Sequence, residues 1–350
     1  MCWCDACRAR GYDPVTDTTA AAAHSAEEPA QGSPARVGLV LGAGGVAGGA
    51  FHAGVLAALH DEMGWDAREA DFVVGTSAGA IAASSLRAGL SAPDMLARAE
   101  GRAMSRAGTQ LLSAFGPPLR PPPLDVLGGR MRPLSEIAAT LGRAAARPFA
   151  ARPLALLAGL LPEGTIGTDF IVDGVSALHP DAWPTRPMWV CAVRQRDGRL
   201  VVFGRDAQAT VANAVAASCA IPGFFRPVCI ETETYIDGGV HSPTNADLLR
   251  TDAPELVIVS SPMSYGGQLR RTGVAPVRLW SRLLLDGETY VLRRKSLTVV
   301  AFQPTSQDMS AMGHNPMDPN RRADIARQVY GSTRERLRRP DIRDRLASLI

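Results

Sequence analysis

The chain has 350 residues, of which 46% are hydrophobic, and its 37 lysines and arginines against 34 acidic residues leave a formal net charge of +3. This length and composition allow one large α/β domain with a sizeable core, and the small charge gives no reason to expect a nucleic-acid partner. No uninterrupted run of about 18 apolar residues occurs, so no transmembrane helix is predicted.

Residues 1–34 are polar, rich in alanine and without periodicity, and they predict a poorly ordered tail. The tail lacks the basic and apolar segments of a secretory signal, and the cysteine usage is typical of a reducing compartment, so a cytoplasmic location is expected. A metal site from Cys2, Cys4 and Cys7 with His24 is one alternative to a flexible tail. No second cysteine pair follows at zinc-finger spacing, and we expect no metal. Lipidation of Cys2 or Cys4 is another alternative.

A buried strand is predicted at 36–41, followed by a glycine-rich loop at 42–49 and a helix at 50–59. A glycine-rich loop between strand and helix presents backbone N–H groups to an anion. Two functions fit. Gly42-x-Gly44-x-x-Ala47 matches the loose dinucleotide fingerprint, with Asp61 or Glu62 as its acid. The alternative is an oxyanion hole for a nucleophile elsewhere in the chain.

The next strand–helix unit favours the oxyanion hole. The segment 71–74 predicts the end of a buried strand, Gly75-Thr76-Ser77-Ala78-Gly79 follows, and 81–87 predicts a helix. This is the setting of a nucleophile elbow, which holds the side chain of Ser77 in a strained and exposed position. Gly75 and Gly79 leave room where a Cβ would collide with backbone. The helix start directs its N–H groups and positive dipole end at the serine oxygen.

Residues 91–165 form the least regular part of the sequence. Prolines at 117–118 and 121–123 mark a loop, and apolar segments at 134–141 and 153–162 predict helices. This insertion after the nucleophile helix predicts a cap over the site, or else helices that only stabilise the sheet. The run Leu154–Leu161 is too short to span a bilayer but long enough for peripheral contact with one.

The rest of the chain predicts further core elements. Strands are expected at 188–193 and 200–203, as a hairpin, and at 234–236, 255–260 and 297–302. Helices are expected at 210–219, at 277–292 with amphipathic character, and at 321–350 as a charged, solvated region. Phe224 and Phe225 are candidates for an acyl-chain pocket or for ordinary core packing. Cys191, Cys219 and Cys229 are expected to be ordinary buried thiols.

Three patterns in this order resemble the patatin-like phospholipase family: the loop Gly42–Gly48, the elbow Gly75–Gly79, and Asp237-Gly238-Gly239 preceded by the segment 220–227. Together they span about residues 36–260. The resemblance implies a three-layer α/β/α sandwich with a mostly parallel central sheet. It also implies a catalytic dyad of Ser77 and Asp237, with the N–H groups of Gly44 and Gly45 in the oxyanion hole. The N–H of Ala78 is a further donor candidate. The motif glycines are Gly42, Gly48, Gly75, Gly79, Gly238 and Gly239.

One departure from the family pattern concerns position 47. Many members carry arginine or lysine there, and this chain has Ala47, which puts a cationic contribution to oxyanion or phosphate binding in doubt. A second open point is which residue acts as the general base. His314 lies after Ser77 and Asp237, in the chain order of an α/β-hydrolase triad. We expect the dyad, because the Asp-Gly-Gly turn suits a carboxylate presented in the open at a strand end.

The expected protein is therefore a hydrolytic domain at 35–350 with a cap insertion at about 91–165. It cleaves lipid acyl esters with Ser77 and Asp237 and needs no metal or cofactor. The partner is a lipid or phospholipid, and the oligomeric state is open. An acyltransferase with the same dyad and a catalytically silent lipid or nucleotide binder are the alternatives.

Overall fold

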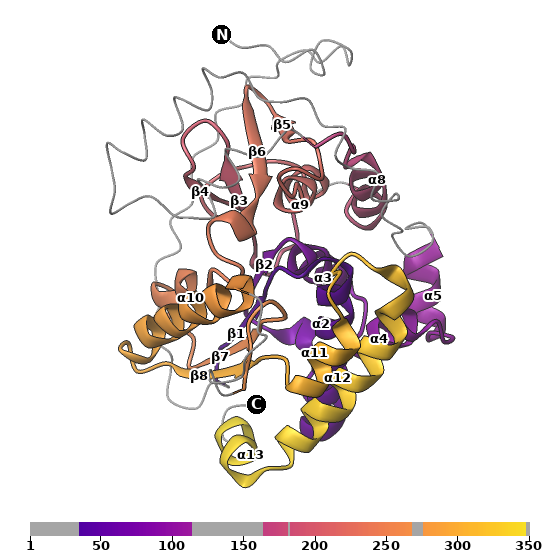
Figure 1. Ribbon diagram of the computed structural model, residues 1–350, viewed down its shortest axis with the longest axis vertical. Helices are drawn as coiled ribbons and strands as arrows, with labels where there is room; N and C mark the ends of the chain where they lie inside the picture. The colour runs from indigo at the N-terminus through magenta and orange to yellow at the C-terminus, as the bar shows by residue number, and fades with distance from the viewer. Residues whose placement is uncertain (1–34, 114–163, 181–182, 268–275, 348–350) are drawn as a thin grey trace.

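The computed structural model describes residues 35–113, 164–180, 183–267 and 276–347 (Figure 1). The expected tail with Cys2, Cys4, Cys7 and His24, the proline-rich loop, and the apolar segments at 134–141 and 153–162 lie outside these residues. None of the helices in the described ranges is both long and apolar enough to cross a bilayer.

A mixed sheet of eight strands forms the centre of the described structure. The strands are β1 (Val37–Leu41), β2 (Phe72–Thr76), β3 (Met188–Arg194), β4 (Leu200–Phe203), β5 (Val228–Ile230), β6 (Glu233–Asp237), β7 (Leu256–Ser260) and β8 (Thr298–Phe302). Their order is β5-β6-β3-β2-β1-β7-β8, with β4 also paired to β3. The strands β3, β2, β1, β7 and β8 pair in parallel, whereas β4, β5 and β6 pair antiparallel. The expected hairpin is confirmed, and β5 is a strand that the sequence did not predict.

The two faces of the sheet bury different cores because alternate strand residues point to opposite faces. In β1, Leu39 and Leu41 belong to the larger core, and Val40 belongs to the second. The larger core includes residues of α2 (Gly45–Met63), α3 (Ala78–Arg87), α4 (Ala92–Glu100), α8 (Asp169–Leu178), α9 (Val211–Ser218) and α12 (Arg322–Leu337). The second includes residues of α10 (Pro276–Arg293) and the short helix η4 (Ala246–Arg250). The expected three-layer α/β/α architecture is confirmed (Figure 1).

The remaining helices are α5 (Arg106–Ser113), α11 (Ser306–Met312) and α13 (Pro340–Ala347), with the short helices η1 (Ala67–Glu69), η3 (Gly238–Val240) and η5 (Pro319–Arg321). Two predictions about helices were wrong. The first helix begins at Gly45, so the residues 45–49 that were expected in a loop form its first turn. The C-terminal helix α12 is not simply solvated, because Ile325, Ala326 and Val329 are buried and the helix packs along α2.

The register of β3 explains how two distant loops meet. Cys191 pairs with Thr76 on β2 and with Val202 on β4, whereas Ala192 pairs with Val201 on β4 and with Asp237 on β6. A strand has two hydrogen-bonding edges. Strand β4 occupies one edge of β3, whereas β2 and β6 share the other edge. The end of β2 and the end of β6 therefore lie beside consecutive residues of β3, which brings Ser77 and Asp237 together.

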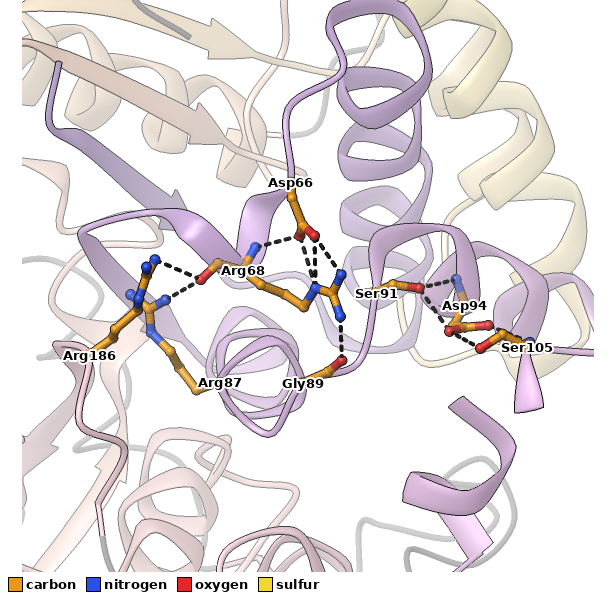
Figure 2. Close-up of polar contacts among 8 residues, drawn as sticks. All are labelled: Asp66, Arg68, Arg87, Gly89, Ser91, Asp94, Ser105 and Arg186. Carbon is orange, nitrogen blue, oxygen red and sulfur yellow. Dashed lines mark hydrogen bonds and ion pairs between the residues drawn. The ribbon is translucent and has the colours of Figure 1, made fainter. Parts of the chain in front are cut away.

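A polar network fixes the start of α4 (Figure 2). Ser91 caps this helix and bonds the Asp94 carboxylate, which also accepts hydrogen bonds from the N–H and the hydroxyl of Ser105 just before α5. Upstream, Arg68 binds Asp66 and donates to the carbonyl of Gly89. The network holds the loop before α4 and the loop after it, and so sets the position of the face that α4 presents to α2.

Candidate functional site

The nucleophile elbow has the geometry that its sequence predicts. Ser77 lies between the last residue of β2 and the first of α3, at φ 55° and ψ −119°, a strained conformation for a residue with a side chain. A Cβ on Gly79 would lie 1.8 Å from the carbonyl oxygen of Leu41, so only glycine allows α3 to approach β1 this closely. The expected exposure of Ser77 was wrong. Ser77 is 3% exposed, and it lines a pocket.

The carboxylate of Asp237 lies against Ser77 at the end of β6. The side chain of Ser77 lies close enough to lower the pKa of Asp237, and the N–H of Gly239 donates to Asp237 Oδ1 at 2.7 Å. Asp237 is 5% exposed, so the expectation of a carboxylate in the open was also wrong. Burial raises the pKa of Asp237 to about 6, against the lowering effect of the hydrogen bonds from Ser77 and Gly239. Desolvation therefore makes this aspartate a stronger base than an exposed one.

The end of α9 connects both residues. The hydroxyl of Ser218 accepts the N–H of Ser77 at 2.8 Å and donates to the carbonyl of Cys191 at 2.6 Å. Two residues later, the carbonyl of Ala220 accepts the N–H of Asp237 at 2.9 Å. The sequence analysis missed Ser218. A lone serine in the alanine-rich helix 210–219 was the available signal, because a buried hydroxyl needs partners.

The glycine-rich loop lies beside the elbow. The N–H of Gly42 donates to the carbonyl of Ser260 and the N–H of Ala43 donates to the carbonyl of Pro243, and these hydrogen bonds hold the loop in place. Gly45 has φ +61°, a conformation that favours glycine. Within the described residues, the N–H groups of Gly44, Gly45 and Ala78 have no protein acceptor, so they are available to a bound anion.

The other motif glycines serve close packing. A Cβ on Gly75 would lie 2.6 Å from the Cα of Ala80, as the elbow prediction requires. A Cβ on Gly238 would lie 2.2 Å from the carbonyl oxygen of Cys191, where the chain leaves β6. A Cβ on Gly239 would lie 2.9 Å from Asp237 Oδ1, and one on Gly48 would lie 3.3 Å from Pro262.

His52 supports the glycine-rich loop from α2. Its Nε2 lies 2.8 Å from the carbonyl oxygen of Gly42, and its Nδ1 lies 2.8 Å from the hydroxyl of Ser260. A carbonyl only accepts, so Nε2 carries the proton. Burial lowers the pKa of His52 to about 4, although the bond to Gly42 acts to raise it, so the ring is neutral at pH 7 and Nδ1 accepts from Ser260. The sequence placed His52 on the helix but did not show this role.

This neutral ring predicts a pH dependence of stability. Unfolded His52 takes up a proton below its ordinary pKa of 6.5, whereas the folded protein resists protonation until about pH 4. The stability contributed by the neutral ring is therefore complete above pH 6.5 and is lost as the pH falls toward 4, by about 3 kcal/mol. Urea unfolding at several pH values should show a smaller acid-induced loss in His52→Gln than in the wild type. An equal acid-induced loss of stability in the two proteins would contradict the neutral state assigned to the His52 ring.

A second buried polar group supports the site from the opposite face of the sheet. The carboxylate of Glu288 on α10 accepts hydrogen bonds from the hydroxyls of Ser242 and Thr244 and from the N–H of Ala246. In the same loop, the side-chain amide of Asn245 donates to the hydroxyl of Thr76, next to Ser77. Burial raises the pKa of Glu288, while these hydrogen bonds lower it. The loop after Asp237 is thus fastened to α10 and to β2.

An apolar pocket opens at Ser77. Its empty space of about 1090 Å³ includes a part that is open to solvent. Most of its lining is aliphatic or aromatic and comes from α2, α3, α4, α5, α8 and the end of α9. Phe225 lines it, as expected, and packs against Phe170 with ring centroids 5.9 Å apart. Phe224 is not among the residues that line the pocket, and its ring packs against the ring of Phe225.

Comparison with known proteins identifies the family. The model of the patatin-like phospholipase family matches residues 39–250. The chain belongs to the patatin-like phospholipase family. No curated protein sequence matches it.

Among solved structures, this patatin-like chain is similar to VipD from Legionella pneumophila, with 15% identity over 86% of the chain and 66% of VipD, at a TM-score of 0.40. It is also similar to the type III effector protein ExoU, with 19% identity over 89% of the chain and 53% of ExoU, at a TM-score of 0.33. The chain thus spans under two thirds of VipD and about half of ExoU.

The dinucleotide alternative does not fit this patatin-like domain. Asp61 and Glu62 lie in the last turn of α2, which at 1.5 Å per residue is about 24 Å from its glycine-rich start. Both carboxylates are bound by residues of α12 and its C-cap, Asp61 by the hydroxyl of Tyr330 and Glu62 by Arg334 and Arg338. Neither acid is near enough to contact a ribose held at the loop.

The histidines of the described residues do not complete a triad. Within the described part of the chain, the partners of the Asp237 carboxylate are Ser77 and the N–H of Gly239. His241 contacts Asn245, and His179 contacts the carbonyl of Ser84. His314, the strongest candidate from chain order, is exposed.

The three cysteines of the described residues form no disulfide with one another. Cys191 and Cys219 are buried as expected, whereas Cys229 is half-buried, contrary to expectation. Cys219 lines the pocket beside Ser77, and burial raises its pKa well above the usual range, with a further raising effect of the Asp237 charge. This thiol is therefore protonated at neutral pH.

Proposed function

We propose that this chain is a serine-dependent lipid acyl hydrolase in which Ser77 is the nucleophile and Asp237 is the general base. One observation carries the proposal. The hydroxyl of Ser77 lies against a buried carboxylate of raised pKa, and Ser77 lines an apolar pocket beside available backbone N–H groups. A lipid acyl chain fits the apolar lining, in agreement with the family of the chain.

In the first half-reaction, Ser77 Oγ attacks the carbonyl carbon of the ester and its proton passes to Asp237. The N–H groups of Gly44, Gly45 and Ala78 receive the negative oxygen of the tetrahedral intermediate. The intermediate collapses, the C–O bond to the alcohol breaks, and Asp237 returns the proton to the leaving oxygen. In the second half-reaction, water attacks the acyl-enzyme, Asp237 takes the proton of the water, and Ser77 regains it as the fatty acid leaves.

Hydrolysis of a short-chain nitrophenyl ester by the purified protein is the first test. Turnover above the rate of the buffer would support an enzyme, and its absence with long- and short-chain esters alike would favour a silent binder. Product analysis with an added alcohol then separates the remaining classes. Free fatty acid as the main product would support the hydrolase, and a new ester as the main product would favour the acyltransferase.

A further inference from the structure

The outward face of α10 carries the exposed large apolar side chains of the described residues. These are Val277, Leu279, Leu283, Tyr290 and Val291. Leu283 and Tyr290 are 56% and 59% exposed. Figure 1 shows α10 on the side of the sheet opposite to α2 and α12. A surface helix ordinarily turns its polar residues outward, so this face has the composition of a contact surface.

The spacing of these residues puts them on one stripe. Leu279, Leu283 and Tyr290 follow one another at intervals of four and seven residues, so their side chains share one side of the helix. The opposite side is buried and holds Ser281, Leu285, Thr289 and Leu292. It also directs the carboxylate of Glu288 to the hydroxyls of Ser242 and Thr244. Polar groups therefore point inward on this helix, and apolar groups point outward.

The C-terminal end of the helix is basic. Arg293, Arg294 and Lys295 are consecutive and exposed. Arg294 lies one turn after Tyr290 on the apolar stripe, and its guanidinium donates to the Tyr290 hydroxyl at 3.4 Å. The exposed acid of α10, Asp286, forms an ion pair with Arg282 at 3.2 Å. The outward face is thus an apolar stripe that ends in three cations.

The other end of α10 is joined to the loop beside Ser77. Arg278 donates to the carbonyls of Pro262 and Ser264, at 2.9 and 3.2 Å. The ring of Pro262 packs on the glycine-rich loop, since a Cβ on Gly44 would lie 2.9 Å from it. The apolar stripe therefore begins at the edge of the sheet that carries the site and runs from there to the basic end.

Charge decides which partner suits this face. If the α10 helices of two copies packed antiparallel, the cations of one would meet the first turn of the other. That turn has no acidic residue and is the positive end of the helix dipole. In a parallel pair, the two basic ends would meet each other. A partner with negative charge fits better than a second copy of the chain.

We propose that the outward face of α10 binds an anionic lipid surface, with the apolar stripe among the acyl chains and the three cations at the headgroups. Helices that lie in a bilayer interface combine these features, and tyrosine suits the level of the headgroups. The choice of a lipid surface over an acidic protein rests on the proposed function, whose substrate is a lipid. The proposal adds where that substrate comes from, because binding through α10 holds the site at an anionic bilayer.

The test is co-sedimentation of the full chain with vesicles of phosphatidylcholine alone, or of equal parts phosphatidylcholine and phosphatidylserine. The wild type should bind the anionic vesicles more tightly. The double variant Leu283→Ser and Tyr290→Ser should bind both kinds of vesicle about tenfold more weakly or less, since it loses two inserted side chains. The triple variant Arg293→Gln, Arg294→Gln and Lys295→Gln should lose about a hundredfold on anionic vesicles alone, at about fivefold for each cation.

A triple variant with the same loss of charge is the matched control: Arg106→Gln, Arg199→Gln and Arg343→Gln. These side chains are exposed on α5, on the turn between β3 and β4, and on α13. The control should bind nearly as the wild type does. Equal weakening in the control, or unchanged binding in both α10 variants, would overturn the proposal. Sedimentation without lipid tests the second copy, since a dimer that only the Leu283→Ser and Tyr290→Ser protein loses would also overturn it.

Vesicle binding needs no turnover, which separates this proposal from the proposed function. The Ser77→Ala protein should bind vesicles as the wild type does. An inactive wild type that binds through α10 would contradict the proposed function alone. An active enzyme whose α10 variants bind vesicles normally would contradict this proposal alone. If both hold, the α10 variants should hydrolyse lipid in anionic vesicles more slowly and a soluble nitrophenyl ester at the wild-type rate.

Discussion

Ser77→Ala is expected to lower kcat for ester hydrolysis by roughly four orders of magnitude or more, to the rate that oxyanion binding alone supports. The reason is that alanine removes the hydroxyl that would form the acyl-enzyme, while the N–H of residue 77 still bonds to Ser218. Thermal unfolding should shift by only a few degrees, about what 1 kcal/mol produces. A nitrophenyl ester assay and a thermal melt of the same preparation check both expectations.

Ser84→Ala is a suitable control for this substitution. Ser84 lies on the same helix α3, and its buried hydroxyl has no hydrogen-bond partner among the described residues. The control should retain wild-type activity. Wild-type turnover in a folded Ser77→Ala protein would contradict the assignment of the nucleophile.

Asp237→Asn is expected to be as damaging as Ser77→Ala, because the amide cannot take the proton of the serine but can still accept the N–H of Gly239. Since burial raises the pKa of Asp237 to about 6, the wild type should lose activity as the carboxylate is protonated. We expect kcat/KM to be level above that pH and to fall by about tenfold for each pH unit below it. A pH–rate profile of the wild type measures this.

His314→Ala separates the dyad from a triad. The dyad predicts that this variant retains most of the activity, because His314 is exposed and Asp237 contacts Ser77 directly. A triad predicts a loss of several orders of magnitude. A folded but inactive His314→Ala protein would therefore contradict the dyad, even if Asp237→Asn is also inactive.

Local pattern was enough to predict most of the strands and the two loops of the site. Strong apolar runs such as 36–41 and 255–260 are strands in the structure, and the glycines at 75 and 79 indicated a tight strand–helix turn. The helix start at Gly45 was missed because glycine has low helix propensity, and here packing outweighs that propensity.

The long-range features of the site could not be predicted from local pattern. The burial of Ser77 and Asp237 depends on β2 and β6 sharing one edge of β3, although β2 and β6 lie far apart in the sequence. The roles of Ser218, His52 and Glu288 also depend on contacts with residues distant in the sequence. Ser218 and His52 are polar residues in apolar helices, which indicates that they need partners but does not say which, and Glu288 lies on an amphipathic helix that gives no such signal.

Labelling of the wild-type protein with a fluorophosphonate, followed by identification of the modified peptide, tests the central claim most directly. Such a reagent phosphonylates a serine that is activated by a base and an oxyanion hole. The account predicts one adduct, on Ser77, which is absent from Ser77→Ala and strongly reduced in Asp237→Asn. An adduct on a different serine, or ester hydrolysis by a protein that takes up no label, would contradict it.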